Sequence, residues 1–374
     1  MKFVVSSTEL SSHLQAMSRV INTKNTIPIL DCFLFSVKSG RLYVTVSDSE
    51  TTMTTSVEVM DADAEGDFAI LAHTLLDALK VGSDQPLTFE VDLATLSITV
   101  KYQNGKYSLM GQAADVYPSS PGLGDNAVTL TIPSDVLMNG IGRTLFATAS
   151  DELRPVMNGI FFDITPEYVT MVSSDGHKLV RYQTTESEAD FKASFILAKK
   201  PAGLLKNLTP KEVADVTISF DSRNAVIKID DYTMVCRLIE GRYPNYNSVI
   251  PQNNPYKVTV DRQSFLSALR RVSIFSSQAS NLVKLSMNSN QLMISAQDVD
   301  FSKAAQESLA CEYQGKEMNI GFKSVFLIDI LSNIVSDEIS IELADPSRAG
   351  VIVPVIQEDG EDLLMLLMPM MLND

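Results

Sequence analysis

The stretch from Phe35 to Asp48, FSVKSGRLYVTVSD, alternates apolar and polar residues on both sides of a polar turn. This period-2 pattern predicts a β-hairpin in which each strand presents one face to a core. The pattern returns without a gap at Phe162–Asp175 (FDITPEYVTMVSSD) and at Leu285–Asp298 (LSMNSNQLMISAQD). The chain therefore contains three copies of one structural unit, and this repetition decides its architecture.

Each hairpin is accompanied by two predicted helices. Short strands that end near Val5, Ile132 and Val260 are followed by polar residues able to cap a helix, and apolar residues then recur at helical spacing. A second helix is predicted in every unit, near residues 72–80, 198–208 and 322–334. The units begin near residues 1, 128 and 257.

The linkers between the units are rich in Pro, Gly and Asn: PSSPGLGDNA at 118–127 and PQNNPY at 251–256. We therefore expect domains at 1–122, 128–251 and 256–374. Because hairpins dominate and long crossovers are scarce, the sheets should be mainly antiparallel, with helices on one face. The fold class is α+β, built three times in tandem.

Composition narrows the class of protein. The chain has 374 residues, 45% hydrophobic and 20% charged, as in globular proteins. Its first residues do not resemble a signal peptide, and the longest apolar run, 363–372, is interrupted by Pro369. Cys32, Cys236 and Cys311 are widely spaced and the three histidines lie in separate segments, so neither a disulfide framework nor a metal site is expected. A cytoplasmic location follows as the expectation.

The net charge of −16 is unevenly distributed. The six predicted helices and their caps carry ten basic and five acidic residues, about +5, which leaves about −21 for the remainder. The helices are thus the basic layer of an acidic protein. Lys and Arg are common on any helix surface, but together with the threefold repeat this layer favours helices that face one anionic partner.

Geometry limits how many helices could surround such a partner. A helix is roughly 10 Å wide, so six side by side enclose a bore of only roughly 9 Å, whereas twelve enclose roughly 28 Å. The larger bore admits a DNA duplex with a layer of water. Two copies joined head to tail would supply twelve helices, as cyclic symmetry allows.

Two other classes of function stay open on the residues alone. An enzyme could use Asp175 and His177 as an acid–base pair, although a hairpin turn with Gly176 at positive φ explains the same residues. A monomeric, non-ring scaffold could use basic helices to bind acidic proteins. Residues 122–127 match the pattern of a dinucleotide-binding fingerprint, but they lie in a linker. The sequence contains no GxxxxGK[ST] phosphate-binding loop, so any use of ATP would belong to a partner.

The chain resembles the beta subunit of bacterial DNA polymerase III, the sliding clamp family, over essentially its whole length. The resemblance rests on the order and spacing of short strings: MKF at the start, 26–30 (TIPIL), 157–162 (MNGIFF), 174–179 (SDGHKL), 241–246 (GRYPNY), 320–322 (IGF) and 368–370 (MPM). It implies a DNA-clamp fold and a head-to-tail homodimeric ring around duplex DNA. It also implies a processivity factor without catalytic residues, cofactor or metal.

The resemblance further implies a set of partners. They are sequence-independent double-stranded DNA, a second copy of the chain, an ATP-driven clamp loader, and the DNA polymerase III alpha subunit with other proteins that carry a clamp-binding motif, but no membrane. Their motifs would enter an apolar pocket between the second and third domains. Methionines suit such a pocket because they repack around varied peptides. The implied pocket residues are Met157, Ser174, Gly176, His177, Lys178, Leu179, Pro244, Val249, Leu366, Met368, Pro369 and Met370.

Two further surfaces follow from the resemblance. The residues expected to face DNA are Lys24, Arg143, Arg154, Lys199, Lys200, Lys206, Arg270 and Arg271. The dimer contact would pair an edge of the first domain near Tyr107 and Leu109 with Ile274 and Phe275 of the partner's third domain, extending one sheet across the interface.

The chain departs from the family pattern at two places. Pro155 and Val156 replace aromatic residues, so a stacking contact to DNA is not carried over at that loop. The family tail ends in Arg-Leu, whereas this chain ends 371–374 in Met-Leu-Asn-Asp, which changes the polar rim of the implied pocket.

Overall fold

A computed structural model describes residues 1–187, 189–208 and 213–372. The three predicted hairpins are present as β2–β3, β11–β12 and β19–β20. Their registers correspond, because Phe35 lies opposite Val44, Phe162 opposite Met171, and Leu285 opposite Ile294. The threefold repeat is therefore confirmed at the level of individual strand pairs.

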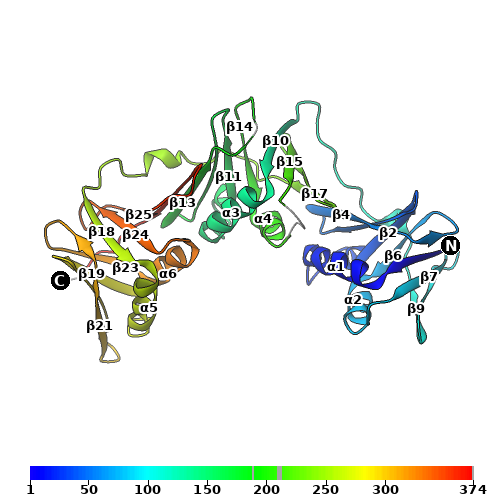
Figure 1. The fold of residues 1–374 in the computed structure, drawn as a ribbon, viewed down its shortest axis with the longest axis horizontal. Coiled ribbons are helices and arrows are strands. Elements are labelled where there is room, and N and C mark those ends of the chain that lie inside the picture. Colours follow the sequence, from blue (N-terminus) through cyan, green and yellow to red (C-terminus); the bar gives the residue numbers. More distant parts are fainter. Residues whose placement is uncertain (188, 209–212, 373–374) are drawn as a thin grey trace. The chain divides into compact units, whose positions relative to one another are not determined.

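The chain divides into two compact units (Figure 1). The first, Met1–Ser134 with Gly203–Leu238, holds two antiparallel sheets in its described residues. The order of one is β5–β1–β7–β8–β9: Asp61–Ala62, Lys2–Ser6, Pro86–Asp92, Ser97–Tyr102 and Gly105–Met110. The order of the other is β10–β15–β16–β17–β4–β3–β2–β6: Val128–Pro133, Asp215–Phe220, Asn224–Ile229, Tyr232–Arg237, Thr51–Glu58, Arg41–Ser47, Cys32–Lys38 and Gly66–Leu71.

The second unit, Asp135–Ala202 with Ile239–Asp374, also holds two antiparallel sheets in its described part. The order of one is β14–β11–β12–β13–β26–β25–β24–β18–β22: Ala193–Ala198, Gly159–Ile164, Val169–Ser174, Lys178–Thr184, Glu361–Leu367, Gly350–Pro354, Glu338–Leu343, Tyr256–Asp261 and Glu312–Tyr313. The order of the other is β21–β20–β19–β23: Lys303–Ala310, Gln291–Asp298, Leu282–Asn288 and Met318–Lys323.

Two α-helices belong to each repeat, as predicted. They are α1 (Ser7–Met17), α2 (Ala72–Lys80), α3 (Ser134–Thr144), α4 (Lys199–Lys206), α5 (Arg262–Ser273) and α6 (Ser324–Asn333). Ser6 and Asp261 cap α1 and α5 by accepting hydrogen bonds from the Glu9 and Ser264 amides. The predicted helices at 198–208 and 322–334 begin too early, because strands β14 and β23 extend to Ala198 and Lys323.

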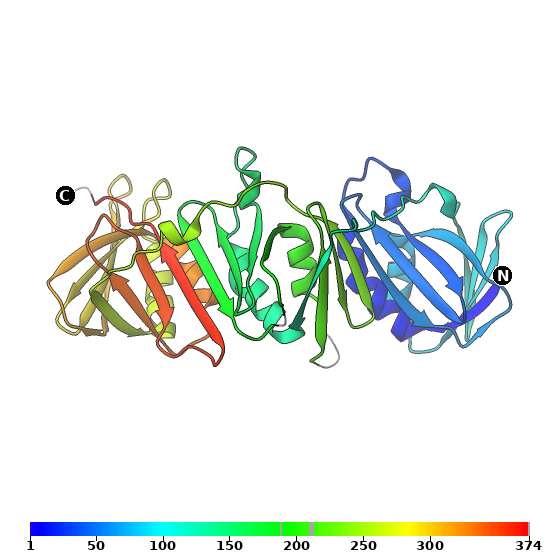
Figure 2. The ribbon, with the colours of Figure 1, turned by 90° about the horizontal axis from the view of Figure 1, so that it is seen from above.

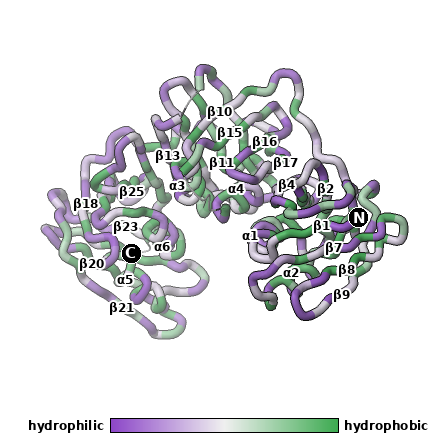
Figure 3. Tube along the Cα trace, turned by 45° about the vertical axis from the view of Figure 1, so that its right-hand side comes forward, coloured by the Kyte–Doolittle hydropathy of each residue, from purple (hydrophilic) through white to green (hydrophobic). Residues whose placement is uncertain are grey.

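Short 3-10 helices occupy several connections: Ser18–Val20, Pro28–Asp31, Ala114–Val116, Leu145–Ala147, Pro155–Met157 and Tyr246–Ser248. Hydrophobic and hydrophilic residues alternate along much of the chain trace (Figure 3). In the first repeat the inward residues include Phe3, whose ring centroid lies 6.3 Å from that of Phe68 in the other sheet, and Phe35, whose ring centroid lies 6.1 Å from that of Phe89. All four rings are fully buried, so they join the two sheets of that repeat.

Strand pairing continues from one repeat into the next. In the first unit β17 of the second repeat pairs with β4 of the first, and in the second unit β26 of the third repeat pairs with β13 of the second. The latter pair is visible as the red and green strands that lie side by side in Figure 2. Because each sheet of the middle repeat is completed by a neighbouring repeat, that repeat divides between the two compact units.

Candidate peptide-binding site

The turn between β12 and β13 is built around one carboxylate. Asp175 accepts hydrogen bonds from the amides of His177 and Lys178, both at 2.9 Å. Ser174 Oγ accepts from the Gly176 amide and donates to the Lys178 carbonyl. Gly176 has φ +90°, as predicted for this turn, and a Cβ there would lie only 3.0 Å from the Arg154 guanidinium. This geometry leaves the His177 side chain 69% exposed.

Lys178 is a buried cation held by this turn. Its ammonium lies 2.6 Å from Asp175 Oδ2, and the Lys178 side chain is only 6% exposed. Burial by itself raises the pKa of Asp175, but the hydrogen bonds donated by Lys178 and by the His177 amide together outweigh burial and lower it. Asp175 is therefore ionised at neutral pH and is engaged as an ion-pair partner.

Phe326 of α6 forms the other side of this cluster. The Lys178 ammonium lies 4.3 Å from the centroid of its ring, the Lys323 ammonium 4.9 Å, and the His177 ring 5.6 Å. Cations over an aromatic face are attracted by its quadrupole. Sequence reasoning missed both Phe326 and Lys323, because an aromatic residue in an apolar helix is typical of a core.

The C-terminal segment lies against the same turn. Strand β26 ends at Leu367, and the Met368 amide then donates to the His177 carbonyl at 2.9 Å. Two residues later the Met370 amide donates to the Gly321 carbonyl at 2.8 Å. A Cβ on Gly321 would lie 2.7 Å from the Met370 carbonyl oxygen, so only glycine allows the tail to cross β23 at this distance. The predicted tail residues Asn373 and Asp374 lie outside the described residues.

Apolar side chains extend the surface beside the turn. Leu179 and Leu366 lie opposite each other in β13 and β26 and share a buried cluster with Tyr243. Phe161 packs against this cluster, with its ring 4.7 Å from that of Tyr243 and 6.2 Å from that of Tyr246.

The remaining predicted pocket residues differ in exposure. Pro244 and Val249 flank the helix that carries Tyr246 and are exposed, and Met368 is 44% exposed. Met157 is buried, while Pro369 and Met370 are half-buried. The structure thus joins Ser174, Gly176, His177, Lys178, Leu179, Leu366 and Met368 by direct contacts, and it adds Arg154, which was predicted to face DNA.

The six α-helices retain their basic excess in the structure. Within their bounds lie eight basic residues and four acidic ones: Lys80, Arg143, Lys199, Lys200, Lys206, Arg262, Arg270 and Arg271, against Glu9, Asp77, Asp135 and Asp329. The predicted charge segregation is therefore present in the observed helices.

Some of the residues predicted to face DNA have acidic partners within the chain. Arg143 pairs with Glu361 at 2.7 Å and is only 14% exposed, and Glu361 also accepts from Tyr182. Burial and the hydrogen bond to Glu361 raise the pKa of Tyr182. Arg154 pairs with Asp151 and Arg271 with Glu307, whereas Lys24, Lys199 and Lys206 are exposed. The basic surface is thus partly neutralised from within.

The predicted dimer residues lie at the edges of sheets or helices. Tyr107 and Leu109 belong to β9, the last strand of its sheet, and both are half-buried. Ile274 follows α5 directly and is 74% exposed, while Phe275 is 38% exposed. Helix α5 packs on β21, the last strand of another sheet.

The structure gives little support to the catalytic alternative. His177 Nδ1 lies 4.0 Å from Asp175 Oδ1, beyond hydrogen-bonding distance, and the carboxylate is committed to Lys178.

Across residues 1–187, 189–208 and 213–372, no group of three or more His, Cys, Asp or Glu side chains is arranged to hold a metal ion. In the same described ranges, none of the helices is both long and apolar enough for a membrane span.

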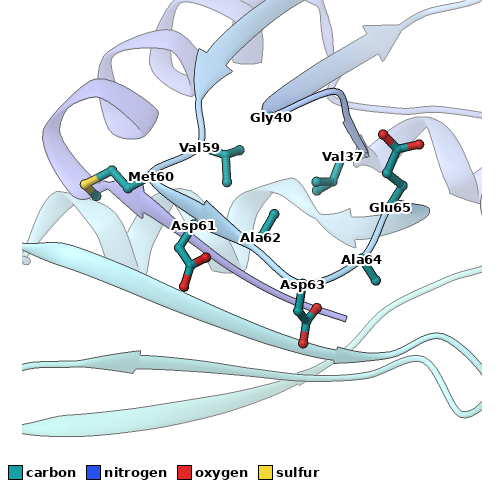
Figure 4. Close-up of a pocket in the computed structure, with 9 residues that line it drawn as sticks. All are labelled: Val37, Gly40, Val59, Met60, Asp61, Ala62, Asp63, Ala64 and Glu65. Carbon is teal, nitrogen blue, oxygen red and sulfur yellow. The ribbon is translucent and has the colours of Figure 1, made fainter.

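A separate hollow of about 470 Å³ lies in the first unit (Figure 4). Its lining includes the carboxylates of Asp61, Asp63 and Glu65. The backbone amides of Lys2 and Ser39 already donate to Asp63 and Glu65. The carboxylates of Asp63 and Glu65 therefore serve local loop structure.

We expect Asp175→Asn to destabilise the second unit by about 3 kcal/mol near neutral pH, because it leaves the Lys178 cation buried and unpaired. Since folding lowers the pKa of Asp175, its stabilisation is present above the unfolded value of about 4 and is lost as the pH falls through the folded value. Chemical denaturation should show the difference from wild type shrinking below about pH 4. The control is the substitution Asp345→Asn in an exposed turn. A stability difference between Asp175→Asn and wild type that does not change with pH would contradict the role given to the Asp175 carboxylate.

Comparison with known proteins agrees with this architecture. Three family models match the chain in order: the N-terminal domain of the DNA polymerase III beta subunit at 1–121, its central domain at 131–245 and its C-terminal domain at 247–370. The beta sliding clamp of Haemophilus influenzae is 26% identical over 348 residues, covering 92% of this chain and 93% of its own. That of Synechococcus elongatus is 27% identical over 366 residues, covering 95% and 96%.

Solved structures show the same fold. The sliding clamp of Pseudomonas aeruginosa bound to griselimycin has a TM-score of 0.93 at 24% identity, and that of Bartonella birtlesii bound to griselimycin 0.90 at 25%, with 100% of each chain covered in both comparisons. The three models together match nearly the whole sequence in the order that the threefold repeat requires. The chain therefore belongs to the DNA polymerase III beta subunit family.

Proposed function

We propose that the chain acts as a DNA sliding clamp: two copies close a ring around duplex DNA and tether the replicative polymerase, which gives processivity. The observation that carries this proposal is the pairing of sheet edges between successive repeats. A third pairing of the same kind, between two copies, would close the ring. The sheets would then have no free edge at the seam.

The two junctions within the chain have the same register. Met234 of β17 lies opposite Met53 of β4, and Met365 of β26 lies opposite Val180 of β13. Each junction ends with an equivalent backbone bond: the Arg237 amide donates to the Glu50 carbonyl, and the Met368 amide donates to the His177 carbonyl, both at 2.9 Å. One geometry is therefore used twice.

The free edges β9 and β21 have the equivalent positions. In β9, Tyr107 lies opposite Val100 of the neighbouring strand β8. The residues at the same position in β17 and β26 are Met234, which lies opposite Ile227, and Met365, which lies opposite Ile352. In β21, Ala305 lies opposite Ala296 of the neighbouring strand β20. The residues at the same position in β4 and β13 are Met53, which lies opposite Val46, and Val180, which lies opposite Ser173. The segments that follow β9 and β26 correspond as well, because Gln112 bridges to Ala69 and Met370 to Gly321.

The common register therefore specifies the seam between two copies. Tyr107 of one copy would lie opposite Ala305 of the other, and Leu109 opposite Lys303. The Met110 amide would donate to the Ser302 carbonyl. Ile274 and Phe275 follow α5, which packs on β21, so their exposed side chains would add apolar area to the seam. This extends the dimer contact expected from the sequence.

The basic helices and the loop residues Lys24 and Arg154 would contact DNA without reading its sequence. Lys24, Lys199, Lys200, Lys206, Arg270 and Arg271 are the candidates, with Arg154 at the edge of the peptide site. Arg143 contributes less charge because Glu361 neutralises it. A closed ring stays on DNA because it encircles the duplex, so weak contacts to the phosphates are sufficient and allow the protein to slide. The protein would perform no chemistry and would need no cofactor, and an ATP-driven loader would open it.

The surface around the 174–179 turn would receive short apolar motifs from the polymerase alpha subunit and from other partners. Its methionines and exposed His177 suit varied peptides. The proposed domains remain 1–122, 128–251 and 256–374, with the peptide site at the second boundary. A cytoplasmic, nucleoid-associated location fits this role.

Retention on DNA tests the ring directly. Protein loaded by a clamp loader onto nicked circular plasmid should stay bound in moderate salt and be lost once the plasmid is cut, as gel filtration would show. Topological binding depends on the DNA ends, whereas electrostatic binding falls steeply with salt. If the protein stays bound after the plasmid is cut and its binding instead falls steeply with salt, the result would favour a monomeric scaffold with basic helices.

Disulfide trapping tests the register of the seam. In a Cys311→Ser background, the pair Tyr107→Cys and Ala305→Cys should form covalent dimers on oxidation, because directly opposed residues in antiparallel strands bring their Cβ atoms to about 5 Å. Non-reducing electrophoresis measures the product. The pair Tyr107→Cys and Leu309→Cys is the control, and preferential trapping of that pair would refute the register.

Two relatives are solved with griselimycin, and we propose that this compound would bind this chain at the peptide site. We expect Met368→Asp to weaken its binding by at least about tenfold, because a charge would enter an apolar contact surface. Titration calorimetry measures the change. Met60→Asp alters another exposed methionine, in the first unit, and should leave binding intact. Unchanged binding in Met368→Asp would place the compound elsewhere.

A further inference from the structure

The turn between β20 and β21 is longer than its two counterparts. From Asp48 to Thr51 and from Asp175 to Lys178 the chain advances three positions, whereas from Asp298 to Lys303 it advances five. The extended turn, Val299–Ser302, carries two exposed apolar side chains. Val299 is 77% exposed and Phe301 is 71% exposed.

These side chains lie at the free edge of the sheet. The Lys303 ammonium is 5.0 Å from the centroid of the Phe301 ring, so Phe301 lies beside the first residue of β21. Val299 lines a hollow of about 890 Å³ together with Ala304 and Gln306 of the same strand. Both residues thus continue the edge that would form the seam.

The inference rests on the proposed ring. In the seam register, Leu109 of a second copy lies opposite Lys303, the residue that contacts Phe301. The next residue of that copy, Met110, is 69% exposed, and its amide would reach the Ser302 carbonyl. Three exposed apolar side chains would therefore converge where the two copies meet.

We propose that the Val299–Ser302 turn is an added part of the self-association surface, with a second copy of the chain as its occupant. Phe301 packs against Leu109 of that copy, and Val299 packs against Met110. This occupant follows from continuity: the turn leads directly into β21, the end strand of its sheet, and the apolar side chains of the turn are exposed in the single chain. Burying them contributes apolar area that the shorter turns of the other two junctions do not provide.

The double variant Val299→Ser with Phe301→Ser tests the proposal. Mixing donor-labelled and acceptor-labelled protein and following energy transfer gives the rate of subunit exchange. We expect this rate to rise at least about tenfold in the variant, because contact losses act mainly on dissociation. Both residues are exposed in the single chain, so the circular dichroism spectrum of the folded protein should not change.

Two further variants make the outcome decisive. Ile356→Ser alters an apolar side chain that is 80% exposed in the turn between β25 and β26, and it should leave exchange unchanged. Leu109→Asp should abolish dimers through the proposed seam itself. If Leu109→Asp gives monomers while the double variant exchanges at the wild-type rate, the role of the turn is overturned and the ring stands. If Leu109→Asp also dimerises normally, the seam and the turn both fail.

Discussion

Antiparallel strand pairing between repeats is the constraint on which the rest of this structure depends. A sheet edge presents unpaired backbone groups, and in this chain the edge of one repeat satisfies the edge of the next. The pairing makes each sheet larger than one repeat can supply. It also places the 174–179 turn of the second repeat beside the tail of the third, so the peptide surface is a product of the junction.

The electrostatic design follows from the same repetition. Basic residues concentrate on the helices while the chain as a whole is acidic. Some of these charges serve structure first, since Arg143 joins α3 to β26 through Glu361 and Tyr182. Pairing of these basic residues within the chain suits a protein that must slide, because every strong phosphate contact would slow its movement along DNA.

Local patterns made much of the fold predictable. Period-2 alternation identified the three hairpins, and the predicted helix at 72–80 matches the observed bounds of α2. The Gly176 turn was also predictable from residue type. Pairing of β13 with β26 was not, because many apolar strands could occupy that edge. For the same reason the Arg143–Glu361 ion pair, which joins residues 218 positions apart, and the ring of Phe326 over Lys178 left no signal in sequence spacing.

The position of β26 has a consequence for synthesis on the ribosome. This strand covers the edge of β13 but is made only after the roughly 180 residues that separate the two strands in the sequence. Until β26 has been synthesised, the edge of β13 in the second unit therefore stays unpaired. During that interval the edge can pair with strands of neighbouring nascent chains, a misassembly that a chaperone would prevent.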